Sequence, residues 1–289
     1  MHASCLCGSI TWDTNMPVES MAHCHCSICR KTHGTAFATY VTVPVEALEL
    51  HGHEHIVRFD SSPEFFRNFC GLCGSVVPGA SFAGHIFLPA GNFDSDPTIR
   101  CEAHWFVRSN PAWFEITDSL RRFDTFPPGF PPADPPDQPR AGSTAPIHGS
   151  CLCSAVAFES TGDVLICRHC HCTRCRKSRS AAHASNLVVP IEGFCFTRGE
   201  DHLTTYKVPE AQFFTQAFCR TCGSPMPRID TARGFVVIPM GGLEEGGLEE
   251  GGLDADPGMR PRNHIFVGSK APWFDITDSL PQFSEQQPT

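Results

Sequence analysis

The sequence has no apolar run that approaches the roughly 18 residues needed by a membrane-spanning helix. It also lacks an excess of basic residues, because 22 Lys and Arg face 31 Asp and Glu and leave a formal charge of −9. Nucleic acids and anionic membranes are recognised by basic surfaces, so we expect neither as a partner. The first residues, MHASC, lack the basic and apolar regions of a secretory signal. We therefore expect a cytoplasmic protein, and the sequence leaves its oligomeric state open.

Helical periodicity is also scarce. No stretch longer than about ten residues repeats its apolar positions with the helical period. Short runs of β-branched and aromatic residues bounded by Gly and Pro take its place. They fall at residues 9–12, 36–43, 56–59, 65–69 and 85–88, and again at 155–158, 185–189 and 235–238. The sequence therefore predicts a mainly β protein with many turns.

Cysteine, by contrast, is abundant. The chain has 17 cysteines, an odd number, and a reducing cytosol disfavours structural disulfides. Metal binding is the interpretation that remains, provided that the spacing of the cysteines supports it.

The chain contains an internal repeat. Four blocks recur in the same order: CLCGS at 5–9 and CLCSA at 151–155, CHCSICRK at 24–31 and CHCTRCRK at 170–177, FCGLCGS at 69–75 and FCRTCGS at 218–224, WFEITDSL at 113–120 and WFDITDSL at 273–280. Such a series indicates a tandem duplication.

The duplication predicts two domains. We place the first at residues 1–124 and the second at 149–284, with a proline-rich linker at 125–148 that acts as an extended spacer. A low-complexity Gly/Glu-rich insertion, GGLEEGGLEEGGL at 241–253, lengthens the second copy.

Four cysteines of each copy have the spacing of a structural zinc site. Cys70 and Cys73 enclose two residues and are followed by glycine, which is typical of a zinc knuckle. A knuckle needs a second pair to complete a tetrahedron, and Cys5 and Cys7 supply it. The corresponding ligands of the second copy are Cys151, Cys153, Cys219 and Cys222.

The remaining three cysteines of each copy form a second cluster: Cys24, Cys26 and Cys29, and likewise Cys170, Cys172 and Cys175. Three thiolates leave one zinc position open, as in a catalytic or exchange-competent site. We therefore expect up to two zinc ions per domain. Two alternatives stay open: His25 or His171 closes the site as a fourth ligand, or the cysteines form a reversible disulfide without metal.

In combination, CLCGS, CHCSICRKTHG, FCGLCGS and WFEITDSL resemble the glutathione-dependent formaldehyde-activating enzyme family, also called the centromere protein V/GFA domain. The resemblance covers residues 3–123 and 149–283. It implies two beta-tent domains, each built of β-sheets around a structural zinc with a second zinc beside it. It also implies a carbon–sulfur lyase activity, the reversible joining of glutathione and formaldehyde into S-hydroxymethylglutathione.

The predicted chemistry fits the open clusters. A zinc ion with three thiolates suits a soft fourth ligand such as the thiolate of glutathione, and proximity to an aldehyde then promotes addition. We therefore expect a zinc-dependent enzyme that acts on adducts of glutathione, or a similar thiol, with an aldehyde. The open-site cysteines would be the catalytic residues. The alternatives are a non-catalytic, zinc-stabilised binding or scaffold module and a zinc or thiol-redox buffer.

Basic residues follow each open cluster. Arg30, Lys31, Arg176 and Lys177 could contact the carboxylates of glutathione, or could be ordinary solvated charges.

Histidine and tryptophan recur before and within the last repeated block. His104 and His264 are candidates for acid–base groups, although packing within the core is the more common role of such histidines. Trp113 and Trp273 are expected to pack under the zinc loops.

The two copies differ near the open cluster. Gly34 and Phe37 of the first copy correspond to Ser180 and His183 of the second. Cys167 replaces a methionine three residues before the second cluster, so we expect it to close or oxidise that site and leave the first site exchangeable.

Two other cysteines, Cys101 and Cys195, have no counterpart in the other copy. We expect both to be buried structural thiols.

Overall fold

The computed structural model describes residues 1–63, 65–130, 146–243 and 258–287. Residues 131–145 of the predicted linker and 244–253 of the predicted insertion lie outside these ranges. Among the described residues, no helix is long and apolar enough to cross a membrane.

The first repeat is built from three sheets and one short α-helix, α1 (Ser27–His33). The small sheet contains β1 (His2–Ser4), β2 (Thr11–Thr14) and β5 (Leu48–His51). The large sheet has the order β12 (Arg121–Phe123), β11 (Ala103–Trp105), β3 (Ser20–Cys24), β4 (Ala38–Pro44), β10 (His85–Pro89), β9 (Ser81–Phe82). The third contains β6 (Ile56–Asp60), β7 (Phe66–Cys70) and β8 (Val76–Val77).

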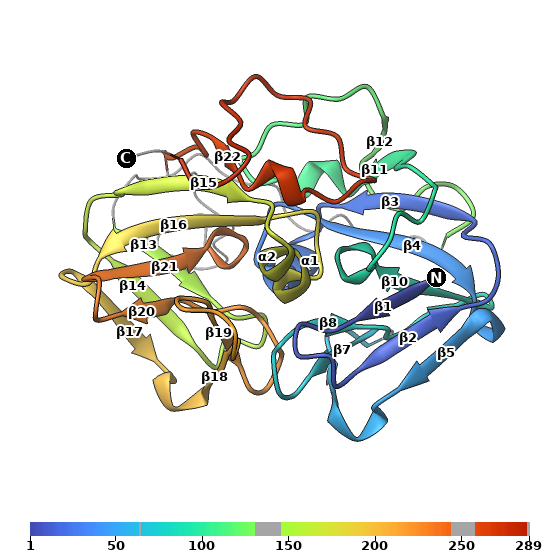
Figure 1. Ribbon diagram of the computed structural model, residues 1–289, viewed down its shortest axis with the longest axis horizontal. Coiled ribbons are helices and arrows are strands. Elements are labelled where there is room, and N and C mark those ends of the chain that lie inside the picture. Colours follow the sequence, from blue (N-terminus) through green and yellow to red (C-terminus); the bar gives the residue numbers. More distant parts are fainter. Residues whose placement is uncertain (64, 131–145, 244–257, 288–289) are drawn as a thin grey trace.

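The second repeat reproduces this arrangement around α2 (Thr173–Arg179), as Figure 1 shows. Its small sheet contains β13 (Ile147–Ser150), β14 (Ala157–Ser160) and β17 (Phe194–Arg198). The large sheet has the order β20 (Arg228–Asp230), β21 (Phe235–Pro239), β16 (Ala184–Pro190), β15 (Ile166–Cys170), β22 (His264–Ile265), and β18 (Leu203–Lys207) pairs with β19 (Thr215–Cys219). The predicted mainly β chain of two similar halves is confirmed.

Cys24 and Cys170, the first cysteines of the open clusters, are the last residues of β3 and β15. β3 pairs antiparallel with β4 and parallel with β11, so Cys24 lies opposite Ala38 on one side and Trp105 on the other. In the second repeat the same pairings set Cys170 against Ala184 and Ile265. The strands therefore fix which side chain neighbours each cluster.

The two α-helices begin at the cysteines themselves. The Cys26 Sγ accepts a hydrogen bond from the Cys29 N–H at 3.3 Å, and α1 ends where Gly34 takes a left-handed φ of 65°. At the equivalent end of α2, Ser180 adopts a φ of 51°. The turn is thus retained despite the change from glycine, and the Ser180 hydroxyl donates to the Val76 carbonyl of the other repeat at 2.9 Å.

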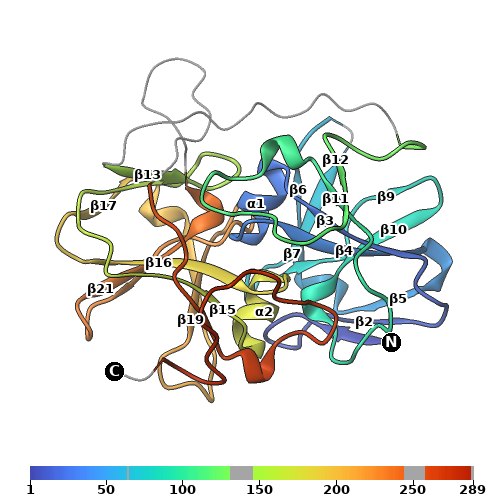
Figure 2. The ribbon, with the colours of Figure 1, turned by 90° about the horizontal axis from the view of Figure 1, so that it is seen from above.

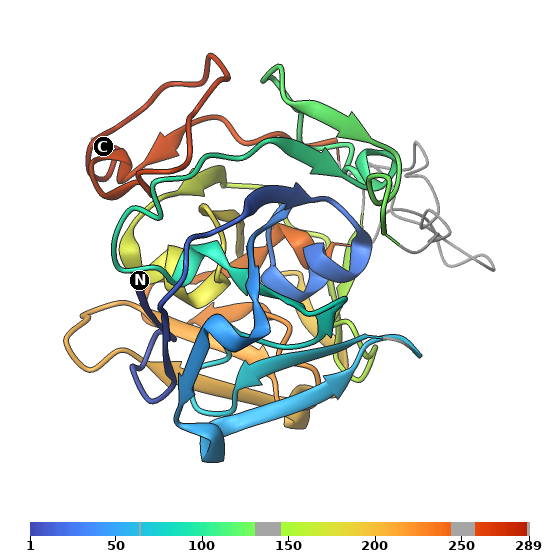
Figure 3. The ribbon, with the colours of Figure 1, turned by 90° about the vertical axis from the view of Figure 1, so that its right-hand side faces the viewer.

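The repeats pack against each other through equivalent residues. Phe69 and Phe218 meet with ring centroids 6.3 Å apart, and the Thr117 and Thr277 hydroxyls lie 2.5 Å apart. One buried apolar cluster contains residues of both halves, including Trp113 and Trp273. Figure 1 shows the helices between the two halves, and Figure 2 shows the same arrangement from above. In Figure 3 the segments that carry β11 and β22, green and red, cross one side of the molecule together.

Close backbone contact between the repeats depends on two equivalent glycines. A short 3₁₀ turn of the second repeat (Met240–Gly242) packs on α1, and a turn of the first (Ala90–Asn92) packs on α2. A Cβ added at Gly241 would lie 2.3 Å from the Arg30 carbonyl oxygen, and one at Gly91 would lie 2.0 Å from the Ala181 nitrogen. Only glycine permits this approach, because the obstructing atoms are backbone.

We predict that Gly241→Ala destabilises the whole chain. The new methyl group has no space, and overpacking of this kind costs about 1–3 kcal/mol or more in the free energy of unfolding. Gly242→Ala is the matched control, because its Cβ would meet only the Ser150 carbonyl oxygen at 3.4 Å. Urea unfolding of the two variants measures the difference. Equal stability of both would contradict the close packing described here.

Candidate metal centres

A quartet of cysteines is assembled in each repeat. The sulfurs of Cys5, Cys7, Cys70 and Cys73 lie within 4.8 Å of one another, as do those of Cys151, Cys153, Cys219 and Cys222. The chemistry of the donor set shows whether a metal fits. Four mostly buried sulfurs around one point match a tetrahedral metal, and backbone N–H groups of Ile10 and Val156 each donate to a cysteine sulfur at 3.3 Å.

Each quartet is tied to a serine just after its knuckle. The Ser75 hydroxyl accepts from the Leu6 N–H at 3.0 Å and donates to the Lys177 carbonyl of the other repeat at 2.9 Å. Ser224 accepts from the Leu152 N–H at 3.0 Å in the same way. The first quartet is therefore linked to the contact between the repeats.

A trio of cysteines forms the second cluster of each repeat. Cys24, Cys26 and Cys29 have their sulfurs within 4.8 Å of one another, and so do Cys170, Cys172 and Cys175. Among the described residues, no fourth His, Cys, Asp or Glu joins either group. Three sulfurs around an open position fit a metal that can accept an external ligand.

The adjacent histidines face away from the trios. The Nε2 of His25 lies 2.8 Å from the Nδ1 of His104, whose Nε2 lies 3.0 Å from the Asp118 carboxylate. Burial lowers the pKa of His25 well below its usual value, and His104 adds to the effect. A neutral His104 then donates to Asp118 and accepts from His25. The Nε2 of His25 is thus bound to His104, and neither ring nitrogen of His25 belongs to the group of ligand atoms formed by the trio.

The second repeat has the same chain of side chains. His171 meets His264 at 2.8 Å, and His264 meets Asp278 at 3.0 Å. Burial lowers the pKa of His171 to about 2. His104 and His264 therefore each connect the histidine next to a trio to an aspartate, and neither borders the chamber described below.

The basic residues after each trio lie elsewhere than expected. Lys31 donates to the Ser150 hydroxyl at 2.8 Å, Lys177 contacts Ser4 and Asp94, and Arg176 donates to the Gly91 and Phe93 carbonyls at 3.0 and 2.9 Å. Arg30 is buried at 2% exposure. Successive helix residues rotate by about 100°, so the residues after Cys29 and Cys175 turn from the cluster toward the other repeat. They connect the repeats instead of facing a glutathione carboxylate in the chamber.

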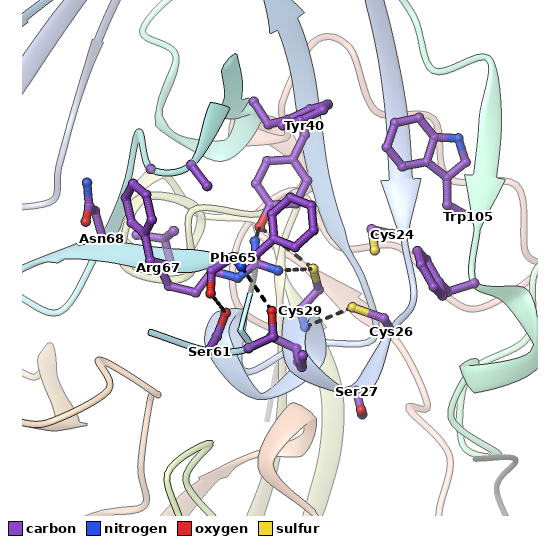
Figure 4. A pocket seen from close by; sticks show the side chains of 18 of the residues that line it. Cys24, Cys26, Ser27, Cys29, Tyr40, Ser61, Phe65, Arg67, Asn68 and Trp105 are labelled. Atoms are coloured by element: carbon purple, nitrogen blue, oxygen red, sulfur yellow. Dashed lines mark hydrogen bonds between the residues drawn. The ribbon is translucent and has the colours of Figure 1, made fainter. Parts of the chain in front are cut away.

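A chamber of about 650 Å³ adjoins the first trio. Figure 4 shows the three cysteines with Tyr40, Arg67 and Trp105 around them. Seven aromatic side chains line the chamber: Tyr40, Phe65, Phe66, Phe87, Trp105, Phe106 and Phe126.

Arg67 and Tyr40 connect the trio to a buried histidine. Arg67 donates to the Cys29 sulfur at 3.8 Å and to the Tyr40 hydroxyl at 3.4 Å. Burial alone would lower the pKa of Arg67, but the Cys29 sulfur raises it above its usual value. Arg67 is therefore a fixed cation beside the trio.

The proton position in this network follows from its partners. The His33 Nδ1 lies 2.7 Å from the Arg179 carbonyl oxygen, which can only accept, so Nδ1 carries the proton. Burial lowers the pKa of His33 to about 4, which keeps the ring neutral. Its Nε2 consequently accepts from the Tyr40 hydroxyl at 2.9 Å.

Sequence reasoning missed Arg67 and Tyr40. Neither lies in a repeated block, and a lone Arg or Tyr in a strand carries no spacing signal. A signal did exist in the difference between the repeats, because the equivalent residues are Gln216 and Asn186. Such a difference becomes visible only when equivalent positions that carry different residues in the two repeats are compared.

The second trio borders a smaller and more polar pocket. Its volume is about 140 Å³, and Cys175, Arg179, Asn186 and Gln216 are among its lining residues. Arg179 occupies the position of His33, and burial lowers its pKa to about 10. The helix thus supplies one cation beside the second trio, and the strand residue Arg228 lines the same pocket.

Cys167 does not close the second site, contrary to expectation. Cys167 and Cys170 are three residues apart on β15, and side chains alternate between faces of a strand. Cys167 therefore points into the core, where its thiol contacts the Met240 sulfur at 3.6 Å. Cys195 also differs from expectation, because it is exposed, and Cys101 is only half-buried.

The fold and the cysteine clusters define a tandem β protein with four candidate metal centres. The chain matches the family described as glutathione-dependent formaldehyde-activating enzyme over residues 1–109 and 146–269, and it belongs to that family.

Single relatives resemble one repeat. A Halomonas elongata protein, provisionally named as a glutathione-dependent formaldehyde-activating enzyme, is 30% identical over 128 residues, which are 40% of this chain and 80% of that protein. A crystal structure of a Rhodobacter sphaeroides protein is 24% identical and covers 37% of this chain and 98% of its own, with a TM-score of 0.27 that supports no argument on the fold.

We predict that a chelator removes bound metal in two phases. The two trios leave a coordination position for the chelator, whereas the quartets are complete, so two ions leave quickly and two slowly. Release is followed with a metallochromic dye. Cys26→Ser and Cys172→Ser should each remove one ion from the fast phase. Release of all ions in a single phase would show that trios and quartets do not differ.

Proposed function

We propose that the chain is a zinc-dependent carbon–sulfur lyase that makes and breaks adducts of glutathione, or a similar thiol, with an aldehyde, and that the first repeat carries the reaction. The observation that supports this most directly is an incomplete sulfur cluster that opens into a chamber of about 650 Å³ beside a half-buried arginine. Family membership supports the same class of reaction.

Zinc is the metal that suits these donors. Clusters made of cysteine sulfur alone favour zinc over the harder cations, which prefer oxygen. Cys24, Cys26 and Cys29 would hold the ion in the first repeat, and when bound it would supply a Lewis-acidic position that favours the thiolate form of an incoming thiol.

For this reaction the protein must place the thiol sulfur next to the carbonyl carbon and stabilise the negative charge that develops on the carbonyl oxygen. The thiol sulfur forms a bond to the carbonyl carbon, the carbonyl π pair moves to oxygen, and the proton lost from sulfur is balanced by one gained at that oxygen. Arg67 can donate to the oxygen as its negative charge develops, which is the type of stabilisation that a fixed cation at the reacting group provides. Tyr40 and His33 hold the guanidinium in place.

The second repeat lacks this arrangement. Gln216 stands in place of Arg67 and Asn186 in place of Tyr40, and the pocket is smaller. We therefore assign the second repeat a supporting role: its helix, turn and loops complete the packing of the first.

We predict that the protein accelerates the exchange between free glutathione and its formaldehyde adduct. Magnetisation-exchange NMR measures this rate directly. Cys26→Ser should abolish the acceleration, and the matched Cys172→Ser should retain most of it. No acceleration by the fully metal-loaded protein would contradict the proposal and favour a binding module. Equal loss in both variants would contradict the assignment to the first repeat.

We predict that Arg67→Gln, which installs the residue found in the second repeat, lowers kcat/KM about a hundredfold, as expected for loss of a donor to a developing oxyanion. Arg67→Lys should recover part of the activity because it restores the charge. Metal content measured on the same samples separates this effect from loss of the site. An unchanged kcat/KM in Arg67→Gln would exclude the proposed contact.

A further inference from the structure

The chamber beside the first trio is much larger than the single carbon of formaldehyde requires. Formaldehyde adds a single carbon to a thiol, whereas the chamber has a volume of about 650 Å³ and continues from the cysteines to Phe87 and Phe126. An enzyme for one-carbon adducts alone would need no aromatic walls beyond the reacting sulfur. The size and lining of this space therefore carry information on the substrate.

One wall of the chamber is a packed group of rings that begins beside the trio. Trp105 stands beside Cys24 because β11 pairs with β3, and its ring meets Phe126 at 5.8 Å and Phe87 at 6.5 Å between centroids. Phe106 and Phe126 meet at 4.7 Å, and the Phe106 N–H donates to the Thr125 carbonyl at 3.4 Å. The first residues of the predicted linker therefore form part of the chamber wall.

The charge of the chamber argues against a peptide in this part of it. Among the described residues that line it, Arg67 is the one Lys, Arg, Asp or Glu, and its guanidinium already contacts Cys29 and Tyr40. Glutathione carries two carboxylates and an ammonium group, which are costly to bury without partners. The aromatic wall instead suits an apolar group, since rings pack against rings in offset and edge-to-face contacts.

The second repeat shows that the wall is not a requirement of the fold. The positions of Phe87, Trp105 and Phe126 are occupied there by Val237, Ile265 and Gln286. The same strands are present without the rings, so the aromatic wall is a separate feature of the first repeat.

We propose that the first repeat acts on thiol adducts of bulky apolar aldehydes, with an aryl or similarly large group held between Trp105, Phe87 and Phe126. This inference rests on the proposed lyase function and specifies its substrate class. The step is the same reversible addition: sulfur bonds to the aldehyde carbon, and one proton leaves sulfur while one reaches oxygen. The polar part of the thiol lies outside the aromatic wall.

The test compares two aldehydes with one thiol. Magnetisation-exchange NMR is run with glutathione and either phenylacetaldehyde or formaldehyde, using the full metal-loaded chain. We expect kcat/KM for phenylacetaldehyde to exceed that for formaldehyde by at least about tenfold, the lower range for one added apolar group in a fitted pocket. Acceleration with formaldehyde but not with phenylacetaldehyde would overturn the inference and leave the lyase function standing.

If neither aldehyde is turned over, the lyase function is contradicted. The preference for a large apolar group is then tested by measuring the binding of unreactive thioethers. S-(2-phenylethyl)glutathione should bind at least about tenfold tighter than S-methylglutathione, by the same reasoning, measured by equilibrium dialysis. Equal binding of the two thioethers would overturn the inference.

Variants locate the preference. Trp105→Ile installs the residue of the second repeat and should lower the ratio of phenylacetaldehyde to formaldehyde kcat/KM, or the ratio of the two thioether affinities, about tenfold. Ile265→Ala truncates the equivalent position of the other repeat and should leave both ratios unchanged. Circular dichroism and metal content establish that each variant is folded. An unchanged ratio in folded Trp105→Ile would show that the wall does not select the substrate.

Discussion

The gathering of sulfur into small clusters is the constraint on which the rest of this molecule depends. Each repeat brings seven cysteines into a quartet and a trio whose sulfurs lie within 4.8 Å of one another. Thiolates this close repel one another unless a cation lies among them, so a metal bound at these clusters would be coupled to folding. The quartet joins the loop after β1 to the turn after β7, and the trio joins the end of β3 to the start of α1. Strands this short could not set these positions by their own hydrogen bonds alone.

Because of the duplication, each repeat packs against the other within one chain. Basic side chains that follow the trios connect the two halves, and paired glycines let the backbones touch. With the packing shared, the two sites were free to diverge. The first has a strand arginine, a tyrosine and an aromatic chamber, whereas the second has a helical arginine and a small polar pocket. The site in the first repeat thus relies on a second repeat whose own site has a different character.

The sequence predicted the mainly β class, part of the strands and both kinds of cysteine cluster, because β-branched or aromatic runs and metal-ligand spacing are local signals. It did not predict β3 or β15, the strands that carry the first cysteine of each trio. It missed α1 and α2, since seven residues are too few to show a helical period. It offered Arg30, Lys31, Arg176 and Lys177 as candidate glutathione contacts, with solvated charge as the alternative, because they follow the trios in sequence. It could not foresee Arg67, which reaches Cys29 from a different sheet, or the direction of Cys167, which follows from strand alternation. The domain boundaries and the identity of the metal stay predictions.

Cadmium NMR of the cadmium-substituted protein distinguishes open from complete clusters, because the resonance position reports how many sulfurs bind each ion. We predict four resonances, two from four-sulfur sites and two from three-sulfur sites. Glutathione should move the first-repeat resonance, assigned with Cys26→Ser, into the four-sulfur range and leave the Cys172-dependent resonance in place. Four resonances that all lie in the four-sulfur range before any thiol is added, or none that responds to it, would contradict an open site in the first repeat.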